Sequence, residues 1–487
     1  MQRVYCVTIN RTLLERGAGM FRRKDPTEQS SMWIATGDLP STPVNSFYQR
    51  LDRVLTEMGF GEQVRALCAP FYEMDASRGG HPGIDPEVYF KMLLVGFFEN
   101  LPSERGIAAR CADSLSIRAF LHYELQERTP EHSSFTVIRQ RLSSEVYEQV
   151  FGVVLKALKK KGLLKGRHLG IDASVIEANA SLASLEHRLT GDAYAEYVKK
   201  LAAAAGVDPN DEGAVRRFDR KRPGRKTSND DWKNPHDPDA KIGRTKRGAT
   251  RMIYKPEHVV DLETGAIVDA DVRPGDEHDT EDLTDRVLSA EARMNRALGD
   301  AIDTERMEVM VGDKGYFKLE EIALLQGVGV ETVVRDPQPS RRLDRLMAED
   351  LAALNGAKSS VQSERGKQLT RARAEKVERS FEQVLDCGGA RRTTLRLREN
   401  VRKRYLIQAA CANLSLLMRH VIGVGTPKQA LAGAYAASIA LFALMLGAMV
   451  PFGRMRLPHR LVLGPGSLRR RLQPLPSAAV SLACGRA

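Results

Sequence analysis

The change of pattern near Gly162 constrains the fold of this chain more than any other feature of its sequence. Before this glycine, apolar residues recur at helical spacing in one segment after another. After it, short runs rich in β-branched residues alternate with helical patterns. A chain of 487 residues is long enough for roughly two or three domains. We therefore predict an all-α N-terminal domain over residues 32–162 and an α/β domain over residues 163–420.

Glycines and capping residues mark the ends of the helices expected in the first domain. Gly59 and Gly61 separate two short helices. Asp85 as the N-cap and Pro86 in the first turn open a third helix, which is apolar enough to be buried. Further helices are predicted over residues 104–111, 116–125, 132–142 and 145–161.

The helix expected over residues 132–142 follows two short helices and a Thr-Pro break, as the reading helix of a helix-turn-helix does. Its apolar residues share one face, which leaves Arg139 and Arg141 among the polar residues that can contact DNA. The alternative is an ordinary helical core with a solvated polar face. The sequence leaves both interpretations open.

The second half of the sequence has the element order strand, strand, strand, helix, strand, helix, strand, helix. This order is typical of an RNase H-like mixed sheet with helices on both faces, so the predicted fold class is α/β. A long insertion, residues 177–256, separates the first two strands and is expected to be mobile unless DNA orders it. The strands are predicted over residues 169–176, 257–262, 266–272, 307–311 and 328–335, and the helices over residues 280–298, 319–325 and 369–385.

Three acidic residues occupy informative positions in this order of elements. Asp172 lies on the first strand, Asp313 follows the fourth strand, and Glu378 lies on the last helix. If the first and fourth strands are neighbours, the two aspartates lie side by side at one edge of the sheet. Two Mg²⁺ ions roughly 3.5 to 4 Å apart, held by carboxylates, can activate the attacking oxygen and stabilise the leaving one in phosphodiester chemistry. Each residue also has a simpler explanation as a turn, cap or solvated residue.

These motifs resemble the bacterial insertion-sequence transposases with a DDE catalytic triad, and the likeness extends over about residues 32–417. It implies that Asp172, Asp313 and Glu378 are the catalytic residues and the metal ligands, for two Mg²⁺ ions that Mn²⁺ can replace. The blocks that carry the resemblance are Pro82-Gly-Ile-Asp-Pro86, Pro130-Glu-His-Ser-Ser-Phe135, Gly170-Ile-Asp172, Gly312-Asp-Lys-Gly-Tyr316 and Val377-Glu-Arg-Ser-Phe381.

The resemblance also implies that the partner is double-stranded DNA, at the terminal inverted repeats and at the target. A homodimer on DNA is expected, because one active site must serve each end. The formal net charge of +12 fits a polyanionic partner. A non-catalytic DNA-binding protein, a transposase that only occupies its ends, is the alternative function, and the three acidic positions favour the enzyme.

The residues that hold DNA depart from the family's pattern. Many relatives place an Arg four residues before the catalytic Glu and a Lys seven residues after it, whereas this chain has Ala374 and Leu385 there. A basic run from Arg391 to Arg404 suits phosphate contacts, with a solvated face as the common alternative. The arginines expected to contact DNA in the α/β domain are Arg371, Arg373, Arg379, Arg391 and Arg392.

Both ends of the chain are predicted to lie outside the two domains. Residues 1–31 carry no periodic pattern and are expected to be disordered. Scattered cysteines without a CxxC pair fit a reducing cytoplasm, where the protein would lie at the nucleoid. The segment Gln429–Gly453 has no charge, but positive charges flank both sides, so a buried or oligomerising helix is preferred to a membrane span. Residues 421–487 are therefore predicted to form this apolar helix and a disordered tail.

Overall fold

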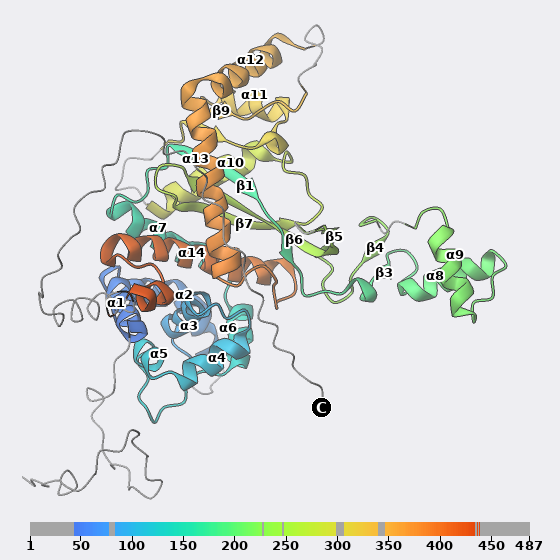
Figure 1. The fold of residues 1–487 in the computed structure, drawn as a ribbon. Helices are drawn as coiled ribbons and strands as arrows, with labels where there is room; N and C mark the ends of the chain where they lie inside the picture. Colours follow the sequence, from blue (N-terminus) through green and yellow to red (C-terminus); the bar gives the residue numbers. More distant parts are fainter. Residues whose placement is uncertain are drawn as a thin grey trace, which may run out of the picture. The chain divides into compact units, whose positions relative to one another are not determined.

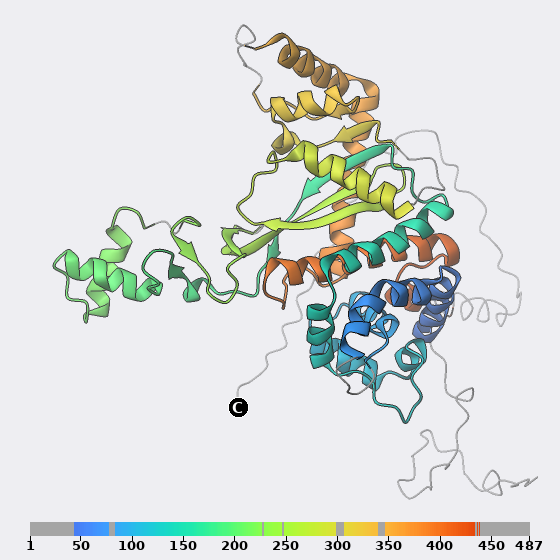
Figure 2. The same ribbon diagram turned by 180° about the vertical axis from the view of Figure 1, so that it is seen from behind.

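A mixed sheet of seven strands forms the centre of the α/β region (Figures 1 and 2). The structure is a computed structural model that describes residues 43–76, 83–225, 228–245, 248–298, 306–338, 346–433, 436 and 438. The strands of this sheet are β1 (His168–Ala173), β2 (Ile176–Glu177), β5 (Lys241–Arg244), β6 (Thr250–Asp261), β7 (Ile267–Pro274), β8 (Val309–Val311) and β9 (Glu331–Val333).

Five of these strands lie in the order β7-β6-β1-β8-β9. Pairing is antiparallel from β7 through β6 to β1, and parallel from β1 through β8 to β9. This order, with these directions, is that of an RNase H-like sheet, and it confirms the fold class predicted from the sequence. β6 begins at Thr250, well before the predicted start at Glu257, because its first half pairs with β5 and with the distant β2.

Helices cover both faces of the sheet. Helix α13 (Glu364–Phe381) lies across one face in Figure 1, where it contacts β1 and β6. Helix α10 (Leu283–Leu298) covers the other face in Figure 2 and contacts β7. The remaining elements of this region are η4 (Lys314–Tyr316), α11 (Leu319–Gly327), α12 (Ala348–Gln362), the π-helical η6 (Glu382–Cys387) and α14 (Arg398–Ile422).

The region before β1 is helical, as predicted. Gly59 separates the first two helices with a positive φ of 62°, a conformation that glycine adopts without strain. The side chain of Asp85 caps α3 by accepting a hydrogen bond of 2.8 Å from the backbone N–H of Glu87, and Pro86 follows in the first turn. The helices are α1 (Pro43–Glu57), α2 (Phe60–Ala76), α3 (Pro86–Phe98), α4 (Glu104–Asp113), α5 (Leu115–Phe120), α6 (His132–Arg141) and α7 (Ser144–Lys160).

The helical region and the sheet share one hydrophobic core. Helix α14 packs against α3 and α7 on one side and against β7 on the other. Both regions belong to one compact unit. Helices give way to strands between α7 and β1, close to the boundary predicted after residue 162.

The described residues of the insertion between β1 and β6 form helices and short strands of their own. It contains η3 (Leu182–Ser184), β3 (Glu186–His187), α8 (Tyr194–Ala204), α9 (Glu212–Lys221) and β4 (Trp232–Lys233). His187 stacks on Tyr197 with ring centroids 4.5 Å apart, and Trp232 packs edge-on against both rings. Trp232 is far from His187 and Tyr197 in the sequence, so no local pattern predicted this contact.

Helix α14 belongs to the core, although the sequence suggested a basic surface at its start. Within the described residues one helical stretch, Arg398–Gly433, is long and apolar enough to cross a membrane, with 61% of its apolar window buried in the protein. Buried core helices pass the same test, so this stretch is weak support for a membrane span. The predictions for residues 1–31 and for nearly all of residues 434–487, including most of the uncharged segment, lie outside the described residues.

Candidate active site at the ends of β1 and β8

Parallel pairing of β1 with β8 brings Asp172 and Asp313 to the same end of the sheet. The register pairs Gly170 with Val311, and each aspartate lies two residues further along its own chain. Burial is the main cause of the raised pKa of Asp172, and electrostatic repulsion from the nearby Asp313 carboxylate adds to it. The structure thus brings together the two aspartates that the sequence predicted as neighbours.

A short turn shapes the surroundings of Asp313. This residue is the N-cap of η4, and its side chain accepts a hydrogen bond of 2.7 Å from the backbone N–H of Gly315. A Cβ atom at Gly315 would lie 2.9 Å from Asp313 Oδ1 and 3.4 Å from Asp279 Oδ2. Glycine at this position therefore lets two carboxylates approach the same point of the backbone.

The charge balance at this end of the sheet is unfavourable for an ionised carboxylate. Burial raises the pKa of Asp172 above its ordinary value, and repulsion from Asp313 and Asp279 adds to the rise. The Arg373 guanidinium and a hydrogen bond from the backbone N–H of Ala173 act in the opposite direction. An arrangement that gathers negative charge in this way favours a nearby cation.

Arg373 on α13 is the cation that faces Asp172. Its Nη2 atom lies 2.9 Å from Asp172 Oδ2, and only 13% of its side chain is exposed. The guanidinium also donates to the backbone carbonyl of Ile171, at 3.3 and 3.4 Å. The sequence predicted that Arg373 contacts DNA; in the structure this side chain instead turns inward to the first aspartate.

Glu378 lies on α13, one residue after Val377, which packs against β1 at Gly170. The side chain of Glu378 is exposed. In the part of the chain that the structure describes, no three His, Cys, Asp or Glu side chains stand close enough to hold a metal ion. The residues as they stand therefore do not fit a finished two-metal site, and the role of Glu378 as third ligand stays a prediction.

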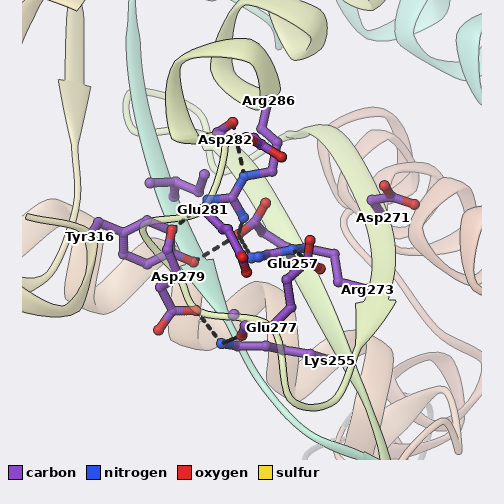
Figure 3. A network of polar contacts seen from close by, with 12 residues as sticks. Lys255, Glu257, Asp271, Arg273, Glu277, Asp279, Glu281, Asp282, Arg286 and Tyr316 are labelled. Carbon is purple, nitrogen blue, oxygen red and sulfur yellow. Dashed lines mark hydrogen bonds and ion pairs between the residues drawn. The ribbon is translucent and has the colours of Figure 1, made fainter. Parts of the chain in front are cut away.

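A second cluster, which the sequence analysis missed, surrounds Glu257 on β6 (Figure 3). Glu257 Oε2 accepts hydrogen bonds from Tyr316 Oη at 3.0 Å, from Arg273 Nη1 at 3.1 Å and from Arg286 Nη1 at 2.7 Å. Burial raises the pKa of Glu257, and the two arginines oppose that rise. The partners lie 16, 29 and 59 residues away along the chain, so no short motif could reveal this cluster.

Asp279 joins the Glu257 cluster to the candidate site. Figure 3 shows its side chain directed toward Lys255, whose Nζ atom lies 2.6 Å from Asp279 Oδ1. The same aspartate lies beside Gly315 and raises the pKa of Asp172. Asp279 is thus an acidic residue of the site that sequence reasoning did not single out, because it follows a strand end in a segment dense in acidic residues.

His258, the next residue on β6, makes a buried contact with the helix that carries Glu378. Its Nδ1 atom lies 2.8 Å from Ser380 Oγ, and its Nε2 atom lies 2.7 Å from Tyr405 Oη. The ring stacks on Phe381 with centroids 4.2 Å apart. Burial lowers the pKa of His258 to about 3, so the ring is neutral at ordinary pH.

Helix α6 presents a polar face that differs from the predicted one. Arg139 is buried and pairs with Glu104, so its side chain does not reach a surface where it could contact DNA. Arg141 lies over the ring of Tyr72, with 4.8 Å between the guanidinium carbon and the ring centroid. The residues of this helix that are both polar and exposed include Ser133, Thr136 and Gln140.

The other predicted DNA contacts lie at the surface. Arg371 is exposed, and Arg379 pairs along α13 with Glu375 at 2.8 Å. Arg391 donates two hydrogen bonds, of 2.6 and 2.7 Å, to the carboxylate of Asp386. The side chain of Arg392 is 70% exposed.

The basic run ends inside the protein. Arg402 pairs with Glu148 and Asp271, each at 2.6 Å. Lys403 is buried and donates to the carbonyl of Arg139 at 3.2 Å. These two cations hold α14 against its neighbours, so only the first part of the run remains a candidate surface for phosphate contact.

Comparison with known proteins links both regions to one kind of enzyme. The family described as "Transposase domain (DUF772)" matches residues 40–141, and the family described as "Transposase DDE domain" matches residues 221–414. A solved structure, "Mos1 transposase paired-end complex with left transposon end", matches with 10% sequence identity over 64% of this chain and 82% of that chain. Its TM-score of 0.18 is too low to support an inference. No curated protein matches the chain.

Proposed function

Since the chain belongs to the insertion-sequence transposases of the DDE superfamily, we propose that it cuts the ends of its own DNA element and joins them to a target. The observation that carries this proposal is the meeting of Asp172 and Asp313 at the ends of two adjacent parallel strands. The two carboxylates lie at the ends of neighbouring strands of an RNase H-like sheet, where the scissile phosphate of a DNA strand can reach them from solvent.

Mg²⁺, or Mn²⁺ in its place, is the cofactor we propose. Asp172 and Asp313 supply the hard oxygen ligands that such ions prefer, and Glu378 is the candidate for a third. The described arrangement does not yet supply that set, because Arg373 holds Asp172 and Glu378 is exposed. Two-metal chemistry is therefore a separate proposal from cutting and joining. It requires Asp172, Asp313 and Glu378 to come together when the protein binds DNA.

Double-stranded DNA is the proposed partner, and α6 is the proposed recognition helix, the helix that contacts base edges. The exposed side chains of Ser133, Thr136 and Gln140 share one stretch of its surface and can both donate and accept hydrogen bonds. Such groups suit base edges in a major groove, whereas exposed arginines on α13 suit phosphates. We further propose a homodimer on DNA, because two ends must be joined together. We also propose that the protein acts in the cytoplasm at the nucleoid, where its DNA partner lies.

The direct test uses purified full-length protein and DNA fragments that flank its reading frame on both sides. We expect strand cleavage at fixed positions when Mg²⁺ or Mn²⁺ is present, and loss of cleavage, with DNA binding retained, in Asp313→Asn. The matched control is Glu364→Gln, an exposed carboxylate at the start of α13 whose loss should leave cleavage intact. Sequence-specific binding without any cleavage by the wild-type protein would instead support the non-catalytic DNA-binding alternative.

A further inference from the structure

β6 runs beside the strand that carries Asp172. The register pairs Asp172 with His258 and Ala173 with Glu257. Successive side chains of a strand point to opposite faces of the sheet. Glu257 and His258 are neighbours on β6, so their side chains lie on opposite faces of the sheet. Both are level with Asp172, the first predicted catalytic residue.

On one face, Glu257 contacts the turn that carries Asp313. Tyr316 closes this turn: its backbone N–H donates to the carbonyl of Asp313 at 3.2 Å, and its hydroxyl donates to Glu257 at 3.0 Å. Arg273 and Arg286 neutralise the carboxylate, which is 6% exposed. A buried carboxylate with three donors has one favourable orientation, so it is a rigid support for the tyrosine.

On the other face, the hydrogen bonds of His258 form an ordered chain. The Ser380 hydroxyl donates to the carbonyl of Val377 at 2.7 Å, so its oxygen accepts from Nδ1–H of His258. Nε2 then has no proton and accepts from the hydroxyl of Tyr405 at 2.7 Å. Every polar atom of the imidazole is satisfied, and the stacked Phe381 ring leaves it little freedom to turn.

The chain of bonds ends next to Glu378. Val377 precedes this residue on α13, and Ser380 follows it by two positions. Directly after Phe381 the α-helix changes into the π-helical segment Glu382–Cys387. The contact of Ser380 with His258 acts together with Arg373 against Asp172 and Val377 against Gly170 to fix which way this part of α13 faces.

We propose that Glu257 and His258 are positioning residues that form a two-sided anchor on β6 for the predicted catalytic acids. Glu257 holds the Asp313 turn through Tyr316, and His258 holds the Glu378 segment of α13 through Ser380. This inference rests on the proposed transposase function for its catalytic consequence. The anchoring itself is a property of the protein without DNA.

The test removes one hydrogen bond at a time, because loss of a buried charge could unfold the protein. Tyr316→Phe deletes the hydroxyl that reaches Glu257, and Ser380→Ala deletes the acceptor of His258. The matched control is Tyr254→Phe on the same strand, whose buried hydroxyl donates to the carboxylate of Asp237 instead. For each variant kcat and KM for cleavage of the end DNA, the affinity for that DNA and Tm are measured.

We expect kcat to fall roughly tenfold or more in Tyr316→Phe and in Ser380→Ala, with KM and DNA affinity nearly unchanged, because small displacements of reacting groups are costly. Tyr254→Phe should lose a similar amount of Tm and keep its kcat. A conservative pair sharpens the result, since His258→Asn retains a donor near the Nδ1 position and should keep more activity than His258→Gln. Equal losses of kcat in the control and in the two test variants would overturn the anchor.

Hydrogen–deuterium exchange of the free protein gives a readout that does not need activity. Tyr316→Phe should speed exchange in residues 312–316, and Ser380→Ala should speed it in residues 374–384, each without a matching change in the other segment. If the wild-type protein cleaves no DNA, the proposed function fails, and unchanged exchange in both variants would overturn the anchor separately.

Discussion

The positions of Asp172 and Asp313 are fixed in a different way from that of Glu378, the third predicted acid. The two aspartates follow hydrogen-bonded backbones, because parallel pairing of β1 with β8 sets their relative position residue by residue. Glu378 lies on a helix that rests on the sheet through side chains. A helix turned by one residue, about 100°, presents a different side chain to the same point. Strand pairing thus places an acid directly, whereas a helix needs further contacts to fix which residue faces the site.

The largest loss of cleavage rate should come from substitutions of the predicted catalytic acids. Asp172→Asn and Asp313→Asn should each lower the cleavage rate by at least about 10³-fold, as loss of a central catalytic group commonly does. Glu378→Gln should match that loss if α13 delivers Glu378 to the DNA complex. Cleavage by Glu378→Gln at the wild-type rate, together with a large loss in Asp279→Asn, would show that the third acid comes from the segment before α10 instead. Band-shift measurements on the same proteins separate cleavage from binding.

Acidic pH should loosen the helix before it loosens the strand end. Burial lowers the pKa of His258 from 6.5 to about 3, so its contribution to stability is present above pH 6.5 and is lost as the pH falls through this window. Burial raises the pKa of Glu257, so the contribution of that group has the opposite sign: it is present at low pH and is lost as the pH rises through the raised pKa.

Exchange measured at pH 5 and pH 7, corrected for intrinsic rates, tests this difference between the two segments. Residues 374–384 should exchange on the order of tenfold faster at pH 5, and residues 312–316 should change less. His258→Asn should remove most of the difference. A uniform change across both segments would mean that global unfolding, and not His258, controls exchange.

The rotation of α6 about its axis should also determine which of its residues contribute to DNA binding. Thr136→Ala and Gln140→Ala should each weaken binding to the element's ends by roughly fivefold or more, with little change for unrelated DNA, because base contacts carry sequence preference. Gln49→Ala, an exposed glutamine on α1, is the matched control. Unchanged preference in both α6 variants would favour the solvated polar face that the sequence left open.

The smallest effect separates two arginines on the same helix. Arg371 is exposed, whereas Arg373 turns to Asp172. Arg371→Gln should therefore reduce the slope of log affinity against log salt by about 1 and weaken DNA binding a few-fold. Arg373→Gln should leave that slope unchanged. An equal change in both slopes would show that Arg373 leaves Asp172 when DNA binds.

Local signals in the sequence predicted the helices well. Asp85 and Pro86 mark the start of α3, and Gly59 ends α1, because capping and positive φ depend on residues only a few positions apart. The rotation of a helix is a different matter. Arg139 was expected at the surface, but it is buried and pairs there with Glu104 from another helix. Helical spacing does not identify such a partner.

The candidate active-site residues also divide into those that local signals predicted and those that depend on contacts between distant segments. Asp172 and Asp313 could be predicted as neighbours, because the RNase H-like order of elements implies that their strands are paired. Glu257 and Asp279 could not, because turns, strands and, in the case of Tyr316, the helix α10 separate them from their partners in the sequence. The folded insertion escaped prediction for the same reason, since His187 and Trp232 meet only after the chain has turned back on itself.

By itself the sequence determined the order of helices and strands, the pairing that this order implies and the two aspartates at the ends of paired strands. Those features rest on local propensity and on backbone hydrogen bonds, which repeat with a fixed period. The tertiary structure alone decided that Arg373 faces Asp172, that Arg139 lies inside the helical region and that His258 contacts the helix of Glu378. Such contacts depend on the packing of side chains between distant segments, for which the sequence carries no period.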